Sequence, residues 1–321
     1  MMFKVLLLGL GNIGMAYDYE KDFDTVVLTH ARAFHEHPKF DLAGAVDIDV
    51  CKRRQFSTRY ASPSFVDTDS AIASLHPDIV VVATPTENHR ADVEAVLCRH
   101  SPKAILCEKP LAYAVSDAES IVASCAARNC SLYVNYMRNS EPGALEVKQR
   151  LLDGRIQSPV KGLVWYSKGV FNNGSHFLNL MQNWLGDVLC VRSYSDGRCW
   201  NGMDPEPDFK ATFRKGEILF LAAREENFSH YTAELLAVNG RLRYDQAGAA
   251  IVWQKATSDA LFADYMILDE PGVIIKTDYH RSLWHVVDQL ASSLEGKHAE
   301  ICSGTDALLT IRALEEITVT P

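Results

Sequence analysis

A glycine motif near the N-terminus constrains the fold of this chain more than any other feature. The apolar run Phe3–Leu8 leads directly into Gly9-Leu10-Gly11-Asn12-Ile13-Gly14, which matches the pattern G-x-G-x-x-G. In that pattern the first glycine permits a tight turn, the second lets the backbone approach a pyrophosphate, and the third allows close packing of helix on strand. The phosphates then bind at the helix N-terminus. The alternative is a plain glycine turn from a strand into a helix.

Short apolar runs alternate with helical patterns through the first 135 residues. Runs without polar alternation are typical of strands buried on both faces of a parallel sheet. The intervening segments, such as Glu87–Arg99 and Ser116–Arg128, are long enough for crossover helices. The expected strands are Phe3–Leu8, Leu42–Val46, Ile79–Ala83, Ala104–Cys107 and Ser131–Val134. This series predicts an α/β Rossmann domain over residues 1–135 with a doubly wound parallel sheet.

The pattern changes after residue 136. One helical segment, Pro142–Leu152, is followed by strand-like segments that turn signals such as Asn239-Gly240 separate. These segments are Val160–Ser167, Leu189–Tyr194, Phe209–Phe213, Glu217–Ala222, Tyr231–Val238, Arg241–Tyr244 and Ala250–Gln254. Two helical segments, Leu283–Leu294 and Asp306–Ile317, end the chain. We therefore expect an α+β domain over residues 136–321 with a large open, mainly antiparallel sheet. Whether the last helices pack on the first domain stays open.

The acidic partner of the glycine motif identifies the expected dinucleotide. Such a residue lies about 20 positions after the motif and binds the ribose hydroxyls. Asp47 ends the second expected strand but follows Gly14 by 33 residues, so we expect an insertion near Tyr17–Leu28. Glu36 has better spacing but lies in a helical pattern. A carboxylate at Asp47 repels a 2′-phosphate and predicts NAD, while the basic residues Lys52-Arg53-Arg54 keep NADP possible.

Composition excludes several classes of partner. Lys and Arg total 32 against 41 Asp and Glu, so the formal net charge is −9 and binding to a nucleic-acid backbone is not expected. No apolar stretch approaches the roughly 20 residues of a membrane helix, and no signal peptide is apparent, so we expect a cytoplasmic protein. The eight cysteines form no C-x-x-C pair, and the pattern H-E-x-x-H is absent, so no metal site is expected.

With these features and four further motifs, the chain resembles the Gfo/Idh/MocA oxidoreductase family, named for glucose–fructose oxidoreductase and inositol dehydrogenase. Thr84-Pro85-Thr86-Glu87-Asn88-His89 is similar to the family's T-P-x-x-x-H, and Glu108-Lys109-Pro110 is its E-K-P. Two later stretches are also similar to the family's motifs: Asn135 with Arg138 and Pro142, and Gly169 through His176 with Gly186 and Asp187.

The resemblance implies a tightly bound NAD, with NADP possible, and a sugar, polyol or nucleotide-sugar substrate. It also implies that the C-terminal sheet serves the substrate, subunit contacts or both. We expect a homodimer or homotetramer through that sheet. With the glycine motif and Asp47 included, the implied cofactor-binding residues are Gly9, Gly11, Asn12, Ile13, Gly14, Asp47, Thr84, Pro85, Asn88, His89, Glu108, Lys109 and Asn135.

The resemblance also implies catalytic residues. Lys109 takes the family's catalytic lysine role, Glu108 lies near the nicotinamide ribose, and His176, expected in a glycine-bracketed loop, matches the catalytic histidine. Oxidation of a secondary alcohol requires loss of the hydroxyl proton as hydride leaves, which a lysine or histidine can accept. Repulsion by cationic NAD⁺ favours a neutral lysine. Asn172 replaces the family's aspartate four residues before His176, so it can orient the ring but supplies no charge.

The sequence is compatible with three functions. The first is an NAD(P)-dependent dehydrogenase or ketoreductase in which Lys109 and His176 handle the proton, without a decision between them as its acceptor. The second is a glycosidase that uses NAD in a transient oxidation and elimination. The third is a non-catalytic dinucleotide sensor, against which the intact Glu108-Lys109-Pro110 and His176 argue.

Overall fold

The chain divides into two compact units. The computed structural model describes residues 2–21, 26–223, 228, 230–262 and 264–319. The first unit comprises Met1–Ser140 with His280–Ile311, and the second comprises Glu141–Tyr279 with Arg312–Pro321. The chain therefore passes to the second unit a few residues after the expected boundary at 135. It returns near residue 280, and the second division falls within the last helix, α9 (Gly304–Val319).

The first unit contains a six-stranded sheet in the order β3-β2-β1-β4-β5-β6, and every neighbouring pair is parallel. Its strands are β1 (Phe3–Leu8), β2 (Phe40–Val46), β3 (Ser64–Phe65), β4 (Ile79–Val82), β5 (Ala104–Cys107) and β6 (Ser131–Val134). The strand order reverses direction between β1 and β4. This arrangement confirms the expected doubly wound sheet, and only the two-residue β3 was not predicted.

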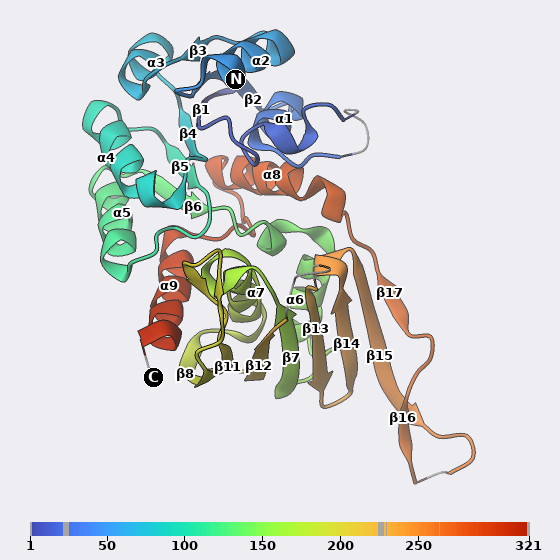
Figure 1. Cartoon of the computed structure of the whole chain (residues 1–321). Helices are drawn as coiled ribbons and strands as arrows, with labels where there is room; N and C mark the ends of the chain where they lie inside the picture. The colour runs from blue at the N-terminus through green and yellow to red at the C-terminus, as the bar shows by residue number, and fades with distance from the viewer. Residues whose placement is uncertain (1, 22–25, 224–227, 229, 263, 320–321) are drawn as a thin grey trace. The chain divides into compact units, whose positions relative to one another are not determined.

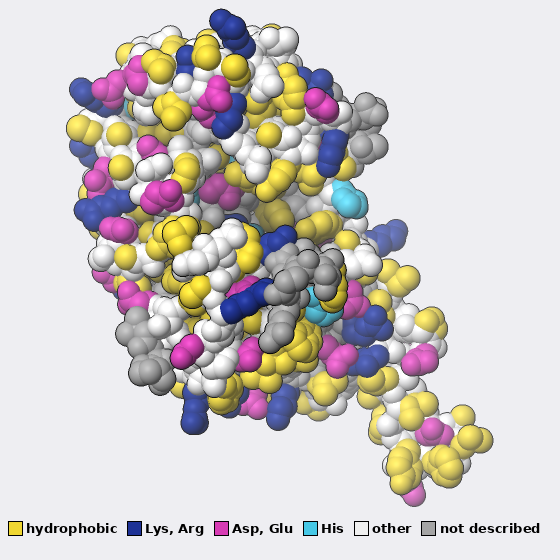
Figure 2. All heavy atoms as spheres, in the orientation of Figure 1, with side chains coloured by type: hydrophobic (Ala, Val, Ile, Leu, Met, Phe, Trp, Pro, Cys, Tyr) yellow, Lys and Arg dark blue, Asp and Glu magenta, His cyan; other side chains and the backbone are white. Residues whose placement is uncertain are grey.

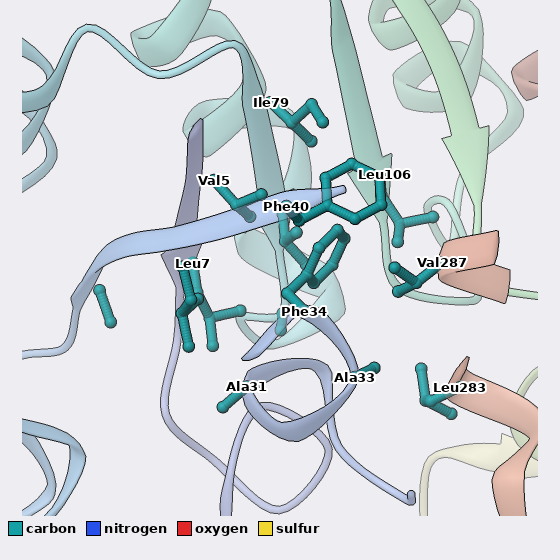
Figure 3. Packing of buried hydrophobic residues seen from close by; sticks show 14 of the residues in the cluster. Val5, Leu7, Ala31, Ala33, Phe34, Phe40, Ile79, Leu106, Leu283 and Val287 are labelled. Atoms are coloured by element: carbon teal, nitrogen blue, oxygen red, sulfur yellow. The ribbon is translucent and has the colours of Figure 1, made fainter. Parts of the chain in front are cut away.

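Helices cover both faces of this sheet (Figure 1). They are α1 (His30–Glu36), α2 (Val50–Tyr60), α3 (Thr68–Leu75), α4 (His89–Arg99), α5 (Val115–Ala127) and α8 (Ser282–Leu294). On one face, α1, α2 and α8 share a core with alternate strand residues such as Val5, Ile79 and Leu106. Phe34 of α1 lies edge-on to Phe40 of β2 within this core (Figure 3). The helix α8, which lies near the C-terminus in the sequence, therefore contributes to the core of the first unit.

The glycine motif starts a helix that an insertion interrupts. Residues after Gly11 form a single turn, in which the Met15 amide donates to the Gly11 carbonyl at 2.9 Å. The carbonyls of Ile13 and Gly14 then accept from His30 and Ala31, each at 3.0 Å. These donors lie 17 residues on rather than the four of a continuous α-helix, so thirteen residues, 17–29, are inserted. The insertion expected near Tyr17–Leu28 is therefore present, and it divides the helix that the motif opens.

Removing the insertion restores the expected spacing to the acidic residue, because the 33 residues from Gly14 to Asp47 become 20. Asp18 closes the base of the insertion from a buried position. It accepts hydrogen bonds from the Leu28 amide at 2.6 Å and the Thr29 hydroxyl at 2.7 Å. Arg32, equally buried, lies 3.9 Å from Asp18 and donates to the Val26 carbonyl at 2.8 Å. Residues 22–25 of the insertion lie outside the described residues.

The second unit contains a nine-stranded sheet in the order β16-β15-β14-β13-β7-β12-β11-β8, with β17 also paired to β15. Every pair is antiparallel except β7 with β12, which confirms the large, mainly antiparallel sheet. Its strands are β7 (Val160–Tyr166), β8 (Val188–Ser195), β11 (Asp208–Phe213), β12 (Gly216–Ala222), β13 (Thr232–Ala237), β14 (Gly240–Asp245), β15 (Ala250–Ser258), β16 (Met266–Leu268) and β17 (Val273–Ile275). A small separate hairpin joins β9 (Cys199–Trp200) and β10 (Asp204–Pro205).

Two helices, α6 (Pro142–Leu152) and α7 (Ser175–Leu185), pack on one face of this sheet, and α7 contacts β7 and β11. The Trp184 indole of α7 donates to the Ala144 carbonyl of α6 at 3.0 Å and joins the two helices. The end of the β15–β16 ribbon carries exposed apolar side chains, among them Leu261, Phe262 and Tyr265 (Figure 2). No helix in the described ranges combines the length and the apolar character needed to cross a membrane.

Candidate functional site

The expected cofactor-binding residues follow five parallel strands at one edge of the first sheet. The glycine motif follows β1, Asp47 follows β2, Thr84 follows β4, Glu108 follows β5 and Asn135 follows β6 (Figure 1). Parallel strands bring their carboxyl ends to one edge, and ligands of doubly wound sheets bind where the strand order reverses. In this sheet that position lies between β1 and β4. The topology therefore gathers these motifs around a single binding position.

The three glycines of the motif each meet a different steric requirement. Gly9 has φ +92°, and a Cβ there would lie 2.6 Å from the Ala83 carbonyl oxygen, so the turn requires glycine. A Cβ on Gly14 would lie 2.2 Å from the Gly9 carbonyl oxygen. Nothing lies within 4 Å of a Cβ built on Gly11, which leaves its backbone open to approach. Asn12 is exposed, whereas the Ile13 side chain packs against the core, so Ile13 can offer a ligand only its backbone.

Asp47 is held directly against the glycine motif. Its Oδ2 accepts the Leu10 amide at 2.8 Å and its Oδ1 accepts the Asp49 amide at 2.8 Å. Arg53, one of the basic residues that left NADP possible, donates through Nη1 to the carbonyls of Asp47 and Ile48 at 2.7 and 3.0 Å. The partly buried carboxylate therefore lies beside the phosphate-binding turn, with Arg53 bonded to the backbone beneath it.

The Thr84–His89 segment divides into exposed and structural residues. Pro85 and Asn88 are exposed at the sheet edge, while the Thr84 hydroxyl donates to Asp92 at 2.5 Å. The His89 ring is fully buried, and its nitrogens lie 3.0 and 3.2 Å from the carbonyl oxygens of Thr84 and Leu111. His89 therefore joins the loop after β4 to the loop after β5, a structural role in place of the expected direct contact with the cofactor.

Glu108 is a buried carboxylate at the centre of a hydrogen-bond network. Its Oε1 accepts from Asn135 Nδ2 at 2.6 Å and lies 2.7 Å from His30 Nε2, while its Oε2 accepts the Lys109 amide at 3.2 Å. Burial has the largest effect on the pKa of Glu108 and by itself would raise it. The hydrogen bond and the charge of His30, the hydrogen bond from Asn135 and the charge of Lys109 nevertheless hold the pKa of Glu108 below its usual value. The site thus contains a fixed negative charge beside the partly buried Lys109.

Two expectations about this network change with the structure. Asn135 is buried and bonds Glu108, so its amide orients that carboxylate. His30 belongs to the network but was not singled out from the sequence. Its only sequence signal was its place after the insertion, at the position that residue 17 would occupy in a continuous helix. His30 could be recognised from the sequence only if the exact length of the insertion were known, because an error of one residue would place a different side chain at this position.

His176 and Asn172 lie in the second unit, on helical rather than loop structure. His176 is the second residue of α7 and is buried, which corrects its expected place in a loop. Asn172 lies in the π-helical turn η4 (Gly169–Gly174) that leads into α7. The candidate catalytic residues form two groups, one in each unit. Lys109 and Glu108 lie in the first unit, and His176 and Asn172 lie in the second.

A carboxylate that the sequence did not indicate holds the turn η4. Asp204 of β10 accepts the amides of Phe171 and Asn172 at 3.0 and 2.9 Å. A Cβ on Gly169 would lie 2.0 Å from Asp204 Cγ, so glycine is needed for this contact. The separation of 32 residues between Asn172 and Asp204 left no local motif. Within the described residues, no group of three or more His, Cys, Asp or Glu side chains is placed to hold a metal ion.

The comparisons with known proteins agree with this geometry. Residues 3–136 match the family model described as an oxidoreductase family with an NAD-binding Rossmann fold. Over these residues, which form most of the first unit, the chain matches the Gfo/Idh/MocA family of oxidoreductases. The match covers all five strand ends of the candidate site, so the family resemblance noted from the motifs is confirmed.

Relatives and solved structures extend the comparison. The chain is 27% identical to a D-apiose dehydrogenase of Paraburkholderia graminis over 48% of this chain and 47% of that protein. It is 29% identical to an inositol 2-dehydrogenase of Rubrobacter xylanophilus over 43% of this chain and 40% of that protein. The matches thus span about half the length of these relatives or less. An oxidoreductase from Agrobacterium radiobacter, solved with NAD⁺, L-tartaric acid and magnesium, shares the fold: its TM-score is 0.76 at 18% identity, covering 100% of this chain and 97% of that one.

Proposed function

We propose that this protein is an NAD-dependent dehydrogenase or ketoreductase that acts on a secondary alcohol or ketone of a sugar, polyol or nucleotide-sugar. The observation that carries the proposal is the buried, ionised Glu108 beside Lys109, at the same sheet edge as the glycine motif and Asp47. The two curated relatives are named for the oxidation of a sugar and of a cyclic polyol, which supports this substrate class.

The residues at the sheet edge fit a dinucleotide. Gly11 leaves open space at the turn, where backbone amides can contact a pyrophosphate. Asp47, beside that turn, retains acceptor capacity for ribose hydroxyls, since each of its oxygens accepts one hydrogen bond. Glu108 Oε2 likewise accepts one hydrogen bond and has a lone pair left for a hydroxyl. When bound, the nicotinamide would supply the hydride acceptor or donor.

Lys109 handles the hydroxyl proton in this proposal. During oxidation the Lys109 Nζ, which beside cationic NAD⁺ would lose the charge it carries in the free protein, accepts the proton as the C–H bond breaks, and during reduction the ammonium returns it to the developing alkoxide. Such proton transfer by a positioned group contributes roughly 10²–10⁴ in rate. Glu108 stays ionised throughout and, through Oε2, holds the backbone amide of Lys109. The lysine thus acts from a fixed backbone position.

His176 serves the same hydroxyl in the proposal, as a hydrogen-bond partner or second proton carrier. Its position in the first turn of α7 gives the ring a rigid backbone, and Asp204 anchors the turn η4 before it. Asn172 contributes no charge, so a relay through a carboxylate at that position is not available. We therefore assign the proton chemistry to Lys109 and His176 alone.

A binding titration and a substrate screen test this function. NAD⁺ and NADH are titrated into the purified protein by calorimetry, and NADH formation is then followed with sugars, inositols and nucleotide-sugars. We expect both cofactors to bind and at least one substrate class to give sustained net NADH formation. Binding without net turnover, together with cleavage of a glycosidic bond, would instead favour the glycosidase. Binding without any reaction would favour a sensor, and absence of dinucleotide binding would refute all three functions.

A further inference from the structure

His30 is fixed from two sides at the candidate site. It is the first residue of α1 and is fully buried. Its backbone amide donates to the Ile13 carbonyl of the glycine motif at 3.0 Å, and its ring Nε2 lies 2.7 Å from Glu108 Oε1. One residue therefore connects the loop after β1 to the loop after β5, at the position where the strand order reverses.

The direction of the ring's hydrogen bond follows from the state of Glu108. An ionised carboxylate only accepts hydrogen bonds, so the His30 Nε2 atom must carry the proton and donate it. The other ring nitrogen, Nδ1, is buried and has no hydrogen-bond partner among the described residues. The bond to Glu108 is thus the ring's only hydrogen bond in that part of the chain, and a ring at this position is poorly explained by packing alone.

The insertion decides which residue occupies this position. Residues 17–29 leave the helix after the first turn and return with His30 in register, because His30 and Ala31 donate to Ile13 and Gly14 as a continuous helix would. Thr29 caps the resumed helix by accepting the Arg32 amide at 3.3 Å. The buried Asp18 in turn accepts the Thr29 hydroxyl. The insertion is therefore anchored immediately before His30, which keeps the histidine at Glu108.

We propose that His30 is a positioning residue for the reaction. By donating to Oε1, His30 orients the Glu108 carboxylate. Because Oε2 of the same carboxylate accepts the Lys109 amide, this orientation also fixes the position of the Lys109 backbone. The proposal rests on the proposed function in taking Lys109 as the proton carrier. His30 is fully buried, and in this proposal it acts through Glu108 and not on the substrate itself. Its effect reaches the chemistry through one hydrogen bond to a charged group, which predicts a loss of roughly 10–100-fold when that bond is removed.

Two substitutions separate the hydrogen bond from packing. His30→Gln retains an amide N–H donor close to the place of Nε2, whereas His30→Met fills similar volume without a donor. For His30→Met we expect kcat to fall about 10–100-fold with little change in substrate KM or in NAD⁺ affinity. His30→Gln should recover most of that loss. A donor role predicts this rescue, while a purely structural role predicts equal damage in both variants.

A second readout does not depend on turnover. Carbon-13 carboxyl NMR of glutamate-labelled protein follows the ionisation of Glu108, with Glu108→Gln identifying its resonance. His30→Met removes one of the donors that lower the pKa of Glu108 while its burial remains, so the pKa should rise. In His30→Gln the pKa of Glu108 should rise less than in His30→Met, because the donor is kept while the contribution of the histidine's charge is lost. If no substrate is ever turned over, the proposed function fails, but this measurement still decides whether His30 holds the carboxylate ionised.

The same helix provides a matched control. His37, at the end of α1, is also buried, and its Nε2 lies 3.4 Å from a carboxylate oxygen of Asp288 in α8. It is a second histidine–carboxylate pair, away from the strand ends. His37→Met should leave kcat and the Glu108 resonance unchanged. The proposal is overturned if His30→Met matches wild type in turnover and in Glu108 ionisation, or if His30→Gln is as impaired as His30→Met.

Discussion

Asp47 accepts the backbone amide of Leu10 through Oδ2 at 2.8 Å, although the two residues are 37 positions apart. The bond fixes the acidic residue of the second strand against the turn of the glycine motif. A carboxylate in this place accepts ribose hydroxyls and repels a 2′-phosphate. Arg53, the adjacent cation, is bonded to the carbonyls of Asp47 and Ile48. The geometry therefore favours NAD over NADP.

Replacing the charge of Asp47 should reduce this preference. In Asp47→Asn the side-chain oxygen can still accept the Leu10 amide, so the turn is retained while the negative charge is lost. We expect the ratio of NADP⁺ to NAD⁺ dissociation constants to fall by about tenfold, the effect of one hydrogen bond to a charged group. Calorimetric titration of both oxidised cofactors measures it.

Asp49 provides the control for that substitution. It is exposed, two residues further on, and caps α2 by accepting the Cys51 amide at 2.7 Å. Asp49→Asn removes the same charge from the same loop and should leave the cofactor ratio unchanged. An equal shift in both variants would assign the effect to general electrostatics. Tighter binding of NADP⁺ than NAD⁺ by the wild type would contradict the assignment of Asp47.

The strand ends could be predicted from the sequence because they depend on local pattern. Apolar runs such as Ile79–Val82 have no polar alternation, which is typical of strands buried on both faces. Once those runs form one parallel sheet, the residues that follow them must share an edge. That geometric rule explains why Asp47 shares an edge with Glu108 and Asn135, which the family resemblance had indicated.

The missed features depend on contacts between distant residues. His30 follows an insertion whose exact length decides its register, and composition alone does not supply that length. Asp204 reaches Asn172 across 32 residues through a two-residue strand, which is too short to carry a pattern. The glycines around His176 suggested a loop, but Gly169 and Gly174 belong to a π-helical turn, where Gly169 makes room for Asp204.

Removing the amine of Lys109 should separate chemistry from cofactor binding. Lys109→Met retains much of the side-chain length but cannot carry a proton, so turnover should fall by roughly 10²–10⁴, or about 3–5 kcal/mol. NAD⁺ affinity should change little, because the lysine's contribution is to the reacting hydroxyl. Steady-state kinetics on the substrate found by screening, with calorimetric NAD⁺ titration, measures both quantities.

Two further variants test whether the loss of turnover in Lys109→Met comes from proton transfer. Lys103 lies immediately before β5, at the opposite end of that strand from Lys109, and forms an exposed ion pair with Asp78 at 2.9 Å. Lys103→Met should therefore leave turnover unchanged. His176→Ala should reduce turnover as Lys109→Met does. If the two residues serve one proton, the double variant loses less than the product of the single losses. Full activity in Lys109→Met would rule out the lysine as the proton carrier.

The ionised state of Glu108 predicts a pH dependence of stability. Its folded pKa is lowered, so the unfolded state binds the proton more readily. The stabilisation is complete above the unfolded pKa of about 4.3 and is lost as pH falls through the lower folded value. Urea unfolding of wild type and Glu108→Gln from pH 7 downward should give a difference that is constant near neutrality and shrinks below about pH 4. A difference that grows on acidification would mean that the pKa is raised.

The outer face of the second sheet predicts self-association. Along β7 and β12 the residues facing the helices are buried, while Leu163, Trp165, Leu219 and Leu221 on the opposite face are only partly buried. Leu163 pairs with Leu219, and Trp165 with Leu221, so the four form one apolar patch. A second copy of the chain would cover the patch, and we expect a homodimer or homotetramer by light scattering at micromolar concentration.

A charge placed in that patch tests the assignment of the interface. Leu219→Lys would leave an ammonium in the buried centre of such an interface, where desolvation is costly, so the assembly should dissociate to monomers while each subunit stays folded. Leu152→Lys at the end of α6, where the leucine is 60% exposed, adds the same charge to the same unit and should leave the mass unchanged. Sedimentation velocity with circular dichroism compares the two. A wild-type monomer would refute association, whereas an unchanged oligomer in Leu219→Lys would place the interface elsewhere on the molecule.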